Sequence, residues 1–126
     1  MRSREVALRS KRFEAEEKAR KVEALEQMIR EFEQMASDLQ RQVQAEEERT
    51  GIRDPSHFAY STFAKAASLR HENLLASIAG LRSQLAHAVR ERDEARADIA
   101  ASEAAEALDA DRGRRRADRL TGLSLR

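Results

Sequence analysis

The sequence predicts an all-α protein, an antiparallel two-helix coiled-coil hairpin. Three observations lead to this fold class. Of the 126 residues, 37% are charged and only 4% are aromatic, a composition rich in helix formers and poor in strand formers. Apolar or small residues recur with a period near 3.5 over two long segments. A glycine and the single proline fall between these segments, where the chain must turn.

The first helix is expected over about residues 5–49. Two rows of residues repeat at intervals of seven, which is the heptad pattern of a coiled coil. The a row is Leu8, Ala15, Val22, Ile29, Ala36 and Val43, and the d row is Lys11, Lys18, Leu25, Phe32, Leu39 and Glu46. Gly51 directly after this segment predicts a left-handed cap at the end of the helix.

The connection is expected over residues 50–60. Asp54 can cap the turn that begins at Pro55, with room for one helical turn at 55–59. Ser61 and Thr62 offer the start of the second helix, expected over about residues 61–112. Its two heptad rows are Ala64, His71, Ile78, Leu85, Arg92 and Ile99, and Ala67, Leu74, Leu81, Ala88, Ala95 and Ser102. Together the helices make a hairpin of residues 1–112.

Residues 113–126 are expected to form a basic C-terminal tail outside the hairpin. Gly113 and Gly122 lower the helix propensity of this stretch, so an ordered and a disordered tail are both compatible with the sequence.

The pairing register follows from folding the chain about residue 55, so that paired numbers sum to 110. Ile29 then faces Leu81 and Phe32 faces Ile78, and every a position meets a d position. Toward the termini the pairs become small or polar. Lys18 falls opposite Arg92, and like charges at one level repel. We therefore expect a loosely paired open end, at which Leu8 contributes little to stability.

The charges alternate along the chain although the net charge is only +1. Residues 1–21 carry eight Lys or Arg and four Glu, and residues 112–126 carry six Arg and one Asp, which gives +4 and +5. Residues 22–48 and 71–111 are acidic, at −6 and −5, and residues 49–70 around the turn carry +3. In a hairpin the two basic ends come together, and we expect no acidic residues of the chain itself to neutralise them.

This basic open end is the main candidate for binding a partner, because concentrated like charge lowers stability unless opposite charges neutralise it. A plain solvated surface is the alternative. The candidate residues are Arg9, Lys11, Arg12, Lys18, Arg112, Arg114, Arg115 and Arg116. At the tip, Phe58, Tyr60 and Phe63 either plug the end of the hairpin or form a docking patch. Met28 and Met35 flank the seam, where two hairpins could pair.

Catalytic, cofactor and metal sites are not expected, nor is a small-molecule substrate. The chain has no cysteine and no phosphate-binding or nucleophile motif. His87 and Glu91 have a metal-binding spacing but lack further ligands nearby. No secretory signal or membrane-spanning stretch is evident, so a cytoplasmic location is expected by default. RGRRRADR at 112–119 makes nucleic acid the alternative partner.

Residues 14–78, and most specifically AEEERTGIRDPSHFAYSTFAKAA at 45–67, resemble the flagellar export protein FliJ family in a short form. The resemblance covers roughly residues 1–100, and the basic, glycine-containing end departs from the family. The family forms a two-helix coiled coil similar to the stalk of rotary ATPases. The resemblance implies a component of the flagellar type III export apparatus, cytoplasmic and peripherally associated with the inner-membrane apparatus. The implied partners are the export ATPase ring, the membrane export gate protein and export chaperones.

Overall fold

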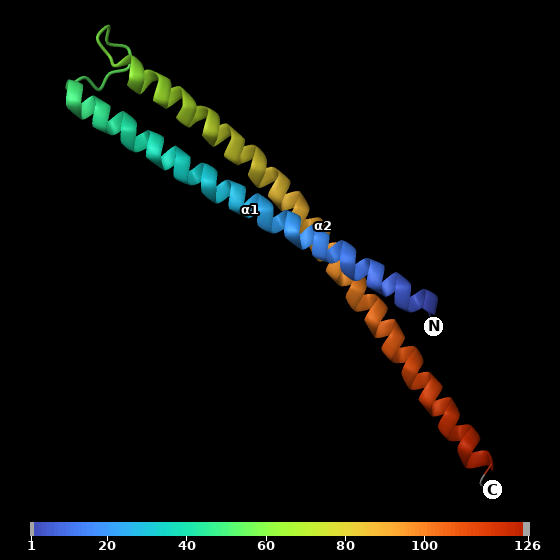
Figure 1. The fold of residues 1–126 in the computed structure, drawn as a ribbon. Helices are drawn as coiled ribbons and strands as arrows, with labels where there is room; N and C mark the ends of the chain where they lie inside the picture. Colours follow the sequence, from blue (N-terminus) through green and yellow to red (C-terminus); the bar gives the residue numbers. More distant parts are fainter. Residues whose placement is uncertain (1, 125–126) are drawn as a thin grey trace. The chain divides into compact units, whose positions relative to one another are not determined.

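The computed structural model describes residues 2–124, with the side chains of residues 3–122, and contains two long helices (Figure 1). Helix α1 spans Arg2–Thr50 and helix α2 spans Thr62–Ser124. No strand occurs within the described range. The predicted all-α two-helix hairpin is confirmed.

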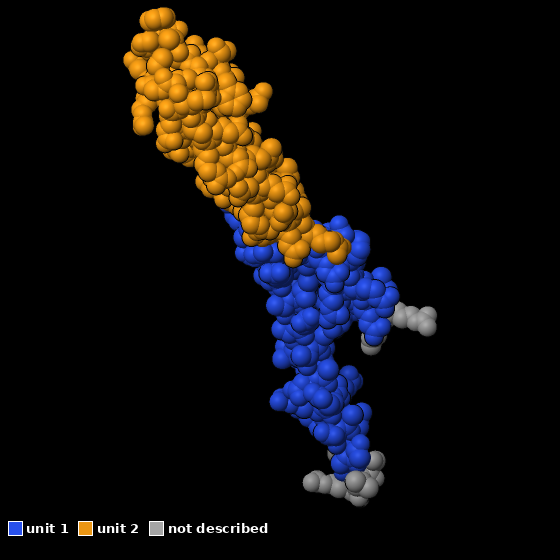
Figure 2. All heavy atoms as spheres, turned by 60° about the vertical axis from the view of Figure 1, so that its left-hand side comes forward, with its two compact units in different colours: residues 1–19, 89–126 blue, residues 20–88 orange. Residues whose placement is uncertain are grey.

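The chain divides into two compact units (Figure 2). Unit 2 comprises residues 20–88, which are the second part of α1, the connection and the first part of α2. Unit 1 comprises residues 1–19 and 89–126, which are the first part of α1 and the rest of α2. In each unit a stretch of α1 lies antiparallel to a stretch of α2.

The core of unit 2 is the predicted heptad seam. Val22, Leu25, Ile29, Ile78 and Leu81 are all buried. All the other a and d positions of this unit are buried or half-buried as well. Burial of this narrow stripe is the main force that holds the two helices together, at about 25 cal/mol per Å² of apolar surface.

Two polar contacts between the helices report the register of unit 2. Arg82 donates to Glu33 at 2.9 Å, and the Ser61 hydroxyl donates to Glu46 at 2.9 Å. The paired residue numbers sum to 115 and 107, on either side of the predicted 110. The agreement lies within about one helical turn.

Local capping explains where the helices end. Gly51 has a φ of 73°, and its N–H donates to the Glu47 carbonyl at 2.9 Å, so the predicted left-handed cap is confirmed. At the start of α2, the Ser61 hydroxyl oxygen accepts a hydrogen bond from the Ala64 N–H at 3.1 Å. Ser61 is thus the N-cap, and the same hydroxyl also ties this cap to Glu46 on α1.

The connection, residues 51–61, contains hydrogen-bonded turns. The sequence had left room for one helical turn at residues 55–59. The Asp54 carboxylate accepts from both the N–H and the hydroxyl of Ser56, at 3.0 and 2.7 Å. The His57 N–H donates to the Asp54 carbonyl, and the Tyr60 N–H donates to the His57 carbonyl, each at 3.0 Å. Two successive turns therefore reverse the chain.

Unit 1 keeps the seam, although with smaller and more polar residues. Leu8 and Ala15 are buried. The other a and d positions of this unit are half-buried, namely Lys11, Lys18, Arg92, Ala95, Ile99 and Ser102. The expectation that Leu8 contributes little rested on its polar partner Ser102, yet Leu8 is only 7% exposed. Ala105 and Glu106, one turn beyond Ser102, lie around the same small groove as Leu8 and enclose it.

The expected end of the second helix near Arg112 is also wrong, since α2 continues to Ser124. Only residues 125–126 of the expected tail lie outside the described range. A glycine costs a helix about 1 kcal/mol and does not by itself break it. Asp111 offsets part of this cost through contacts with Arg114 at 3.9 Å and Arg115 at 3.2 Å, three and four residues along the helix.

Candidate protein-binding surface

The basic first turns of α1 have anionic counterparts on α2. Lys11 donates to the Ser102 hydroxyl at 2.9 Å and lies 3.5 Å from the Asp98 carboxylate. Arg12 pairs with Glu103 at 2.9 Å. The Arg4 guanidinium and the Asp109 carboxylate are 2.5 Å apart. The expectation of an unanswered basic end is therefore wrong for this segment.

The antiparallel register explains this neutralisation. It sets residues 98–109, which contain four acidic side chains and no basic one, beside the start of α1. Pairs this exposed contribute only up to about 1 kcal/mol each, yet they leave less charge for a partner. The predicted repulsion between Lys18 and Arg92 is relieved in a similar way. Arg92 pairs with Asp93 at 3.1 Å, and Lys18 shares a groove with Glu94.

The end of α2 extends beyond the start of α1 within unit 1 (Figure 1). Since Arg4 is level with Asp109 and α1 begins at Arg2, α1 reaches only about half a turn beyond this level, while α2 continues to Ser124. This overhang, residues 112–124, is about 20 Å long at 1.5 Å per residue. All its described side chains, residues 112–122, are exposed.

Four arginines of the overhang share one face of the helix. Arg112, Arg115, Arg116 and Arg119 are spaced i, i+3, i+4 and i+7, which places them within about 100° around the axis. We call these four residues the arginine stripe. Arg115 pairs with Asp111, whereas Arg112, Arg116 and Arg119 make no ion pair with any described side chain.

The structure divides the eight basic candidates into groups. Arg112, Arg115 and Arg116 come together in the arginine stripe, whereas Arg114 lies about 200° round the helix from Arg112. Lys11, Arg12 and Lys18 lie beside acidic groups of α2. Arg9 lies apart on an exposed position of α1. Sequence reasoning missed Arg119, which helical periodicity continued past Gly113 would have found.

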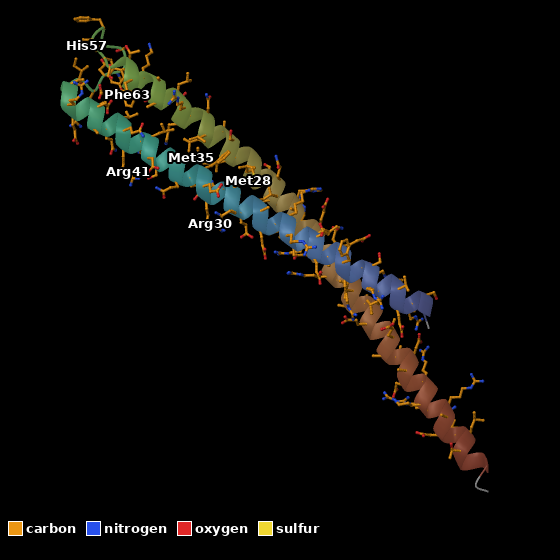
Figure 3. The ribbon with its side chains drawn as sticks, viewed as in Figure 1. Met28, Arg30, Met35, Arg41, His57 and Phe63 are labelled. Atoms are coloured by element: carbon orange, nitrogen blue, oxygen red, sulfur yellow. The ribbon has the colours of Figure 1, made fainter. Side chains whose placement is uncertain are left out.

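Only one of the three tip aromatics, Tyr60, packs against the end of the hairpin. Phe58 is 97% exposed and stacks on the His57 ring at 4.7 Å, and Phe63 is exposed as well (Figure 3). Tyr60 alone is half-buried, and its hydroxyl donates to the Glu47 carboxylate at 2.9 Å. Phe58 and Phe63 are therefore open to a partner, while Tyr60 closes the tip against α1.

Four groups at the tip have shifted pKa values, and among them the hydrogen bond to Glu46 raises the pKa of Arg49. Hydrogen bonds from Arg49 and Ser61 lower the pKa of Glu46, and hydrogen bonds from Ser56 lower the pKa of Asp54. Burial, followed by the hydrogen bond to Glu47, raises the pKa of Tyr60. These shifts come from the hydrogen bonds that fix the connection and, for Tyr60, first from burial.

A shallow groove of about 490 Å³ runs beside the Met-bearing flank of unit 2, where Met35, Leu39 and Leu74 line it with Arg70. Met28 and Met35 are both exposed on α1 (Figure 3). Among residues 2–124, no group of three or more His, Cys, Asp or Glu side chains is placed to hold a metal ion. No described helix has a stretch apolar enough to cross a membrane.

Comparison with known proteins gave no match, whether to protein-family models, to curated proteins or to solved structures. The surface itself therefore carries the functional argument. This surface offers two features: an arginine stripe on the overhang, in which only Arg115 has an ionic partner among the described side chains, and the exposed Phe58 and Phe63 at the tip.

Proposed function

We propose that this chain is a non-enzymatic coiled-coil adaptor of the flagellar type III protein export apparatus, which docks on the export ATPase ring through the arginine stripe. The resemblance of residues 45–67 to the FliJ family and the two-helix hairpin support the proposal. The observation that carries the docking site is the overhang, where Arg112, Arg116 and Arg119 have no described ionic partner.

The arginine stripe suits an acidic protein surface for physical reasons. Guanidinium groups bind carboxylates through paired N–H donors, and they stay charged at every physiological pH. Four of them on one helical face create a local positive field that speeds encounter with an acidic partner. The helix fixes their spacing, so less side-chain freedom is lost on binding than in a disordered tail.

The N-terminal cations take a smaller part in this proposal. Lys11 and Arg12 already contact α2, and a partner would have to displace Ser102, Asp98 or Glu103 to engage them. The gate protein and the export chaperones are further partners, for which Phe58 and Phe63 at the tip offer exposed anchors. The chain would act in the cytoplasm at the inner-membrane export apparatus, with only indirect membrane association.

A second candidate function is binding of nucleic acid or another polyanion. The same arginine stripe favours it, because its charges would also meet a row of phosphates. Binding of this kind is independent of sequence and falls steeply with salt.

The test measures binding of the 126-residue chain to two probes, purified export ATPase and a fluorescein-labelled DNA duplex, at 50 and 200 mM salt. The adaptor function predicts retention of the ATPase at both salt concentrations, with DNA binding weak and lost at 200 mM. Tight DNA binding without ATPase retention would instead favour the polyanion function and overturn the proposal.

A further inference from the structure

Phe13 lies on the outer face of α1 and takes no part in the seam. It is 60% exposed, and it is the sole aromatic residue of unit 1. Val6, one heptad earlier on the same side of the helix, is 59% exposed. A large exposed aromatic residue is a typical anchor of a protein interface, and Val6 lies two turns, about 10 Å, along the same face. Sequence reasoning passed over both residues, because the heptad rows alone drew attention to the seam.

Two opposite charges flank Phe13 along one edge of the same face. Arg9 comes four residues before it and Glu16 three residues after it, and their separation of seven places both on one edge. Both side chains are exposed, and neither makes an ion pair with a described side chain. We call Val6, Arg9, Phe13 and Glu16 the Phe13 face.

We propose that the Phe13 face binds the same face of a second copy of this chain, with the two α1 helices antiparallel and Phe13 on the two-fold axis. Arg9 lies about 6 Å before Phe13 along the helix and Glu16 about 4.5 Å after it, at 1.5 Å per residue. The two-fold axis brings Arg9 level with the partner's Glu16 to within about 1.5 Å. The same edge carries both pairs, because a two-fold axis across an antiparallel helix pair keeps each edge on its own side.

The order of the charges selects this occupant. In a parallel arrangement the two-fold axis would run along the helices and put the partner's Arg9 and Glu16 on the opposite edge of the interface, so neither charge would meet its counterpart. A uniformly acidic partner would meet Glu16, and a uniformly basic one would meet Arg9. Only a surface with the reverse order of charges can pair with both Arg9 and Glu16, and a second copy turned antiparallel has that order. The Met-bearing flank of unit 2 is the rival face for self-association.

The interface is one helical face wide, so we expect a weak dimer that depends on concentration. Sedimentation equilibrium of the full chain should show reversible dimerisation. Arg9→Glu sets two carboxylates against each other at both pairs, and Glu16→Arg does the same with two cations. Each variant alone should raise the dissociation constant about tenfold.

Mixing the two variants is the decisive measurement. In the mixed dimer, Glu at position 9 meets Arg at position 16, and the native Arg9 and Glu16 meet each other. The mixture should therefore regain association near that of the native chain. A change in folding cannot produce this rescue, and far-UV circular dichroism of each variant alone checks that helicity is retained.

Phe13→Ala should weaken association, whereas Met35→Ala and Arg114→Glu should leave it unchanged. Dimerisation that survives Phe13→Ala but is lost with Met35→Ala would place the contact on the Met-bearing flank and overturn the proposal. A native chain that stays monomeric up to about 1 mM, or a mixture no better than its components, would overturn it as well.

Discussion

Leu8 shows that the environment of one side chain depends on how far the opposite helix runs. Its nearest predicted seam partner, Ser102, is polar, yet the next turn of α2 encloses it and leaves it as buried as Leu25. Leu8 is therefore part of the core of unit 1.

We predict that Leu8→Ala lowers the free energy of unfolding by about 2 kcal/mol or more, because a buried leucine loses both its apolar contacts and its filled volume. Leu108→Ala, the same substitution in unit 1 at a position that is 54% exposed, is the matched control and should cost less than about 0.5 kcal/mol. Urea unfolding followed by circular dichroism measures both. Equal small losses would show that unit 1 has no core at this level.

Glu46 is a second residue with a local consequence, since it ties the end of α1 to the cap of α2. Hydrogen bonds from Arg49 and Ser61 lower its pKa below the ordinary 4.5, so the folded chain favours the carboxylate. The resulting stability is present above about pH 4.5 and is lost as the pH falls through the folded-state pKa.

Glu46→Gln should therefore lower the melting temperature at pH 7, and the difference from the native chain should shrink as the pH falls to 3. Thermal unfolding at a series of pH values measures this. A difference that stays constant from pH 7 to pH 3 would mean that ionisation of Glu46 does not stabilise the tip.

At the scale of the helices, the seam of unit 2 sets the register. Ile29 and Leu81 are both buried, and they fall at one level when paired numbers sum to 110. Cysteines placed at these two positions should form a disulfide within one chain, which has no cysteine of its own. Electrophoresis without reductant distinguishes a compact cross-linked monomer from a cross-linked dimer. Cross-linking only between chains would contradict the hairpin.

The overhang poses a different question at this scale, because a helix of about 13 residues without a partner is marginal in water. Gly113 has open space where a Cβ would lie and no left-handed backbone. Gly113→Ala should stabilise this helix by up to about 1 kcal/mol and slow amide exchange at residues 109–119. Exchange at residues 71–88 should stay unchanged and serves as the control. No slowing at residues 109–119 would argue against a helix there in solution.

The elements differ in how well the sequence predicts them. Local patterns predict three features: the seam positions, the Gly51 cap and the start of α2 at Ser61. The heptad period determines the first, and a single residue determines each of the other two. The end of α2 was not predicted from the sequence. A glycine lowers helix stability so little that the neighbouring residues determine whether the helix continues. The pairing of Lys11 and Arg12 needed the position of α2 beside them, which no local pattern contains.

At the scale of the whole molecule, charge is divided between paired and unpaired regions. The first turns of α1 are basic and pair with acidic residues of α2, whereas Arg112, Arg116 and Arg119 of the overhang make no ion pair with a described side chain. A count along the sequence treats these regions alike, at +4 and +5. The structure separates them, and the proposed adaptor function rests on that separation.

Binding of three charge-reversal variants to the purified export ATPase ring tests this claim most directly. Each variant changes two cations to Glu, so the change in net charge is the same. The pairs are Arg112 and Arg116 in the arginine stripe, Lys11 and Arg12 at the start of α1, and Arg30 and Arg41 in unit 2. We predict that the stripe variant binds at least about tenfold more weakly, that the Lys11 and Arg12 variant loses less, and that the unit 2 variant binds like the native chain. Equal weakening by all three variants, or full binding by the stripe variant, would contradict docking through the arginine stripe.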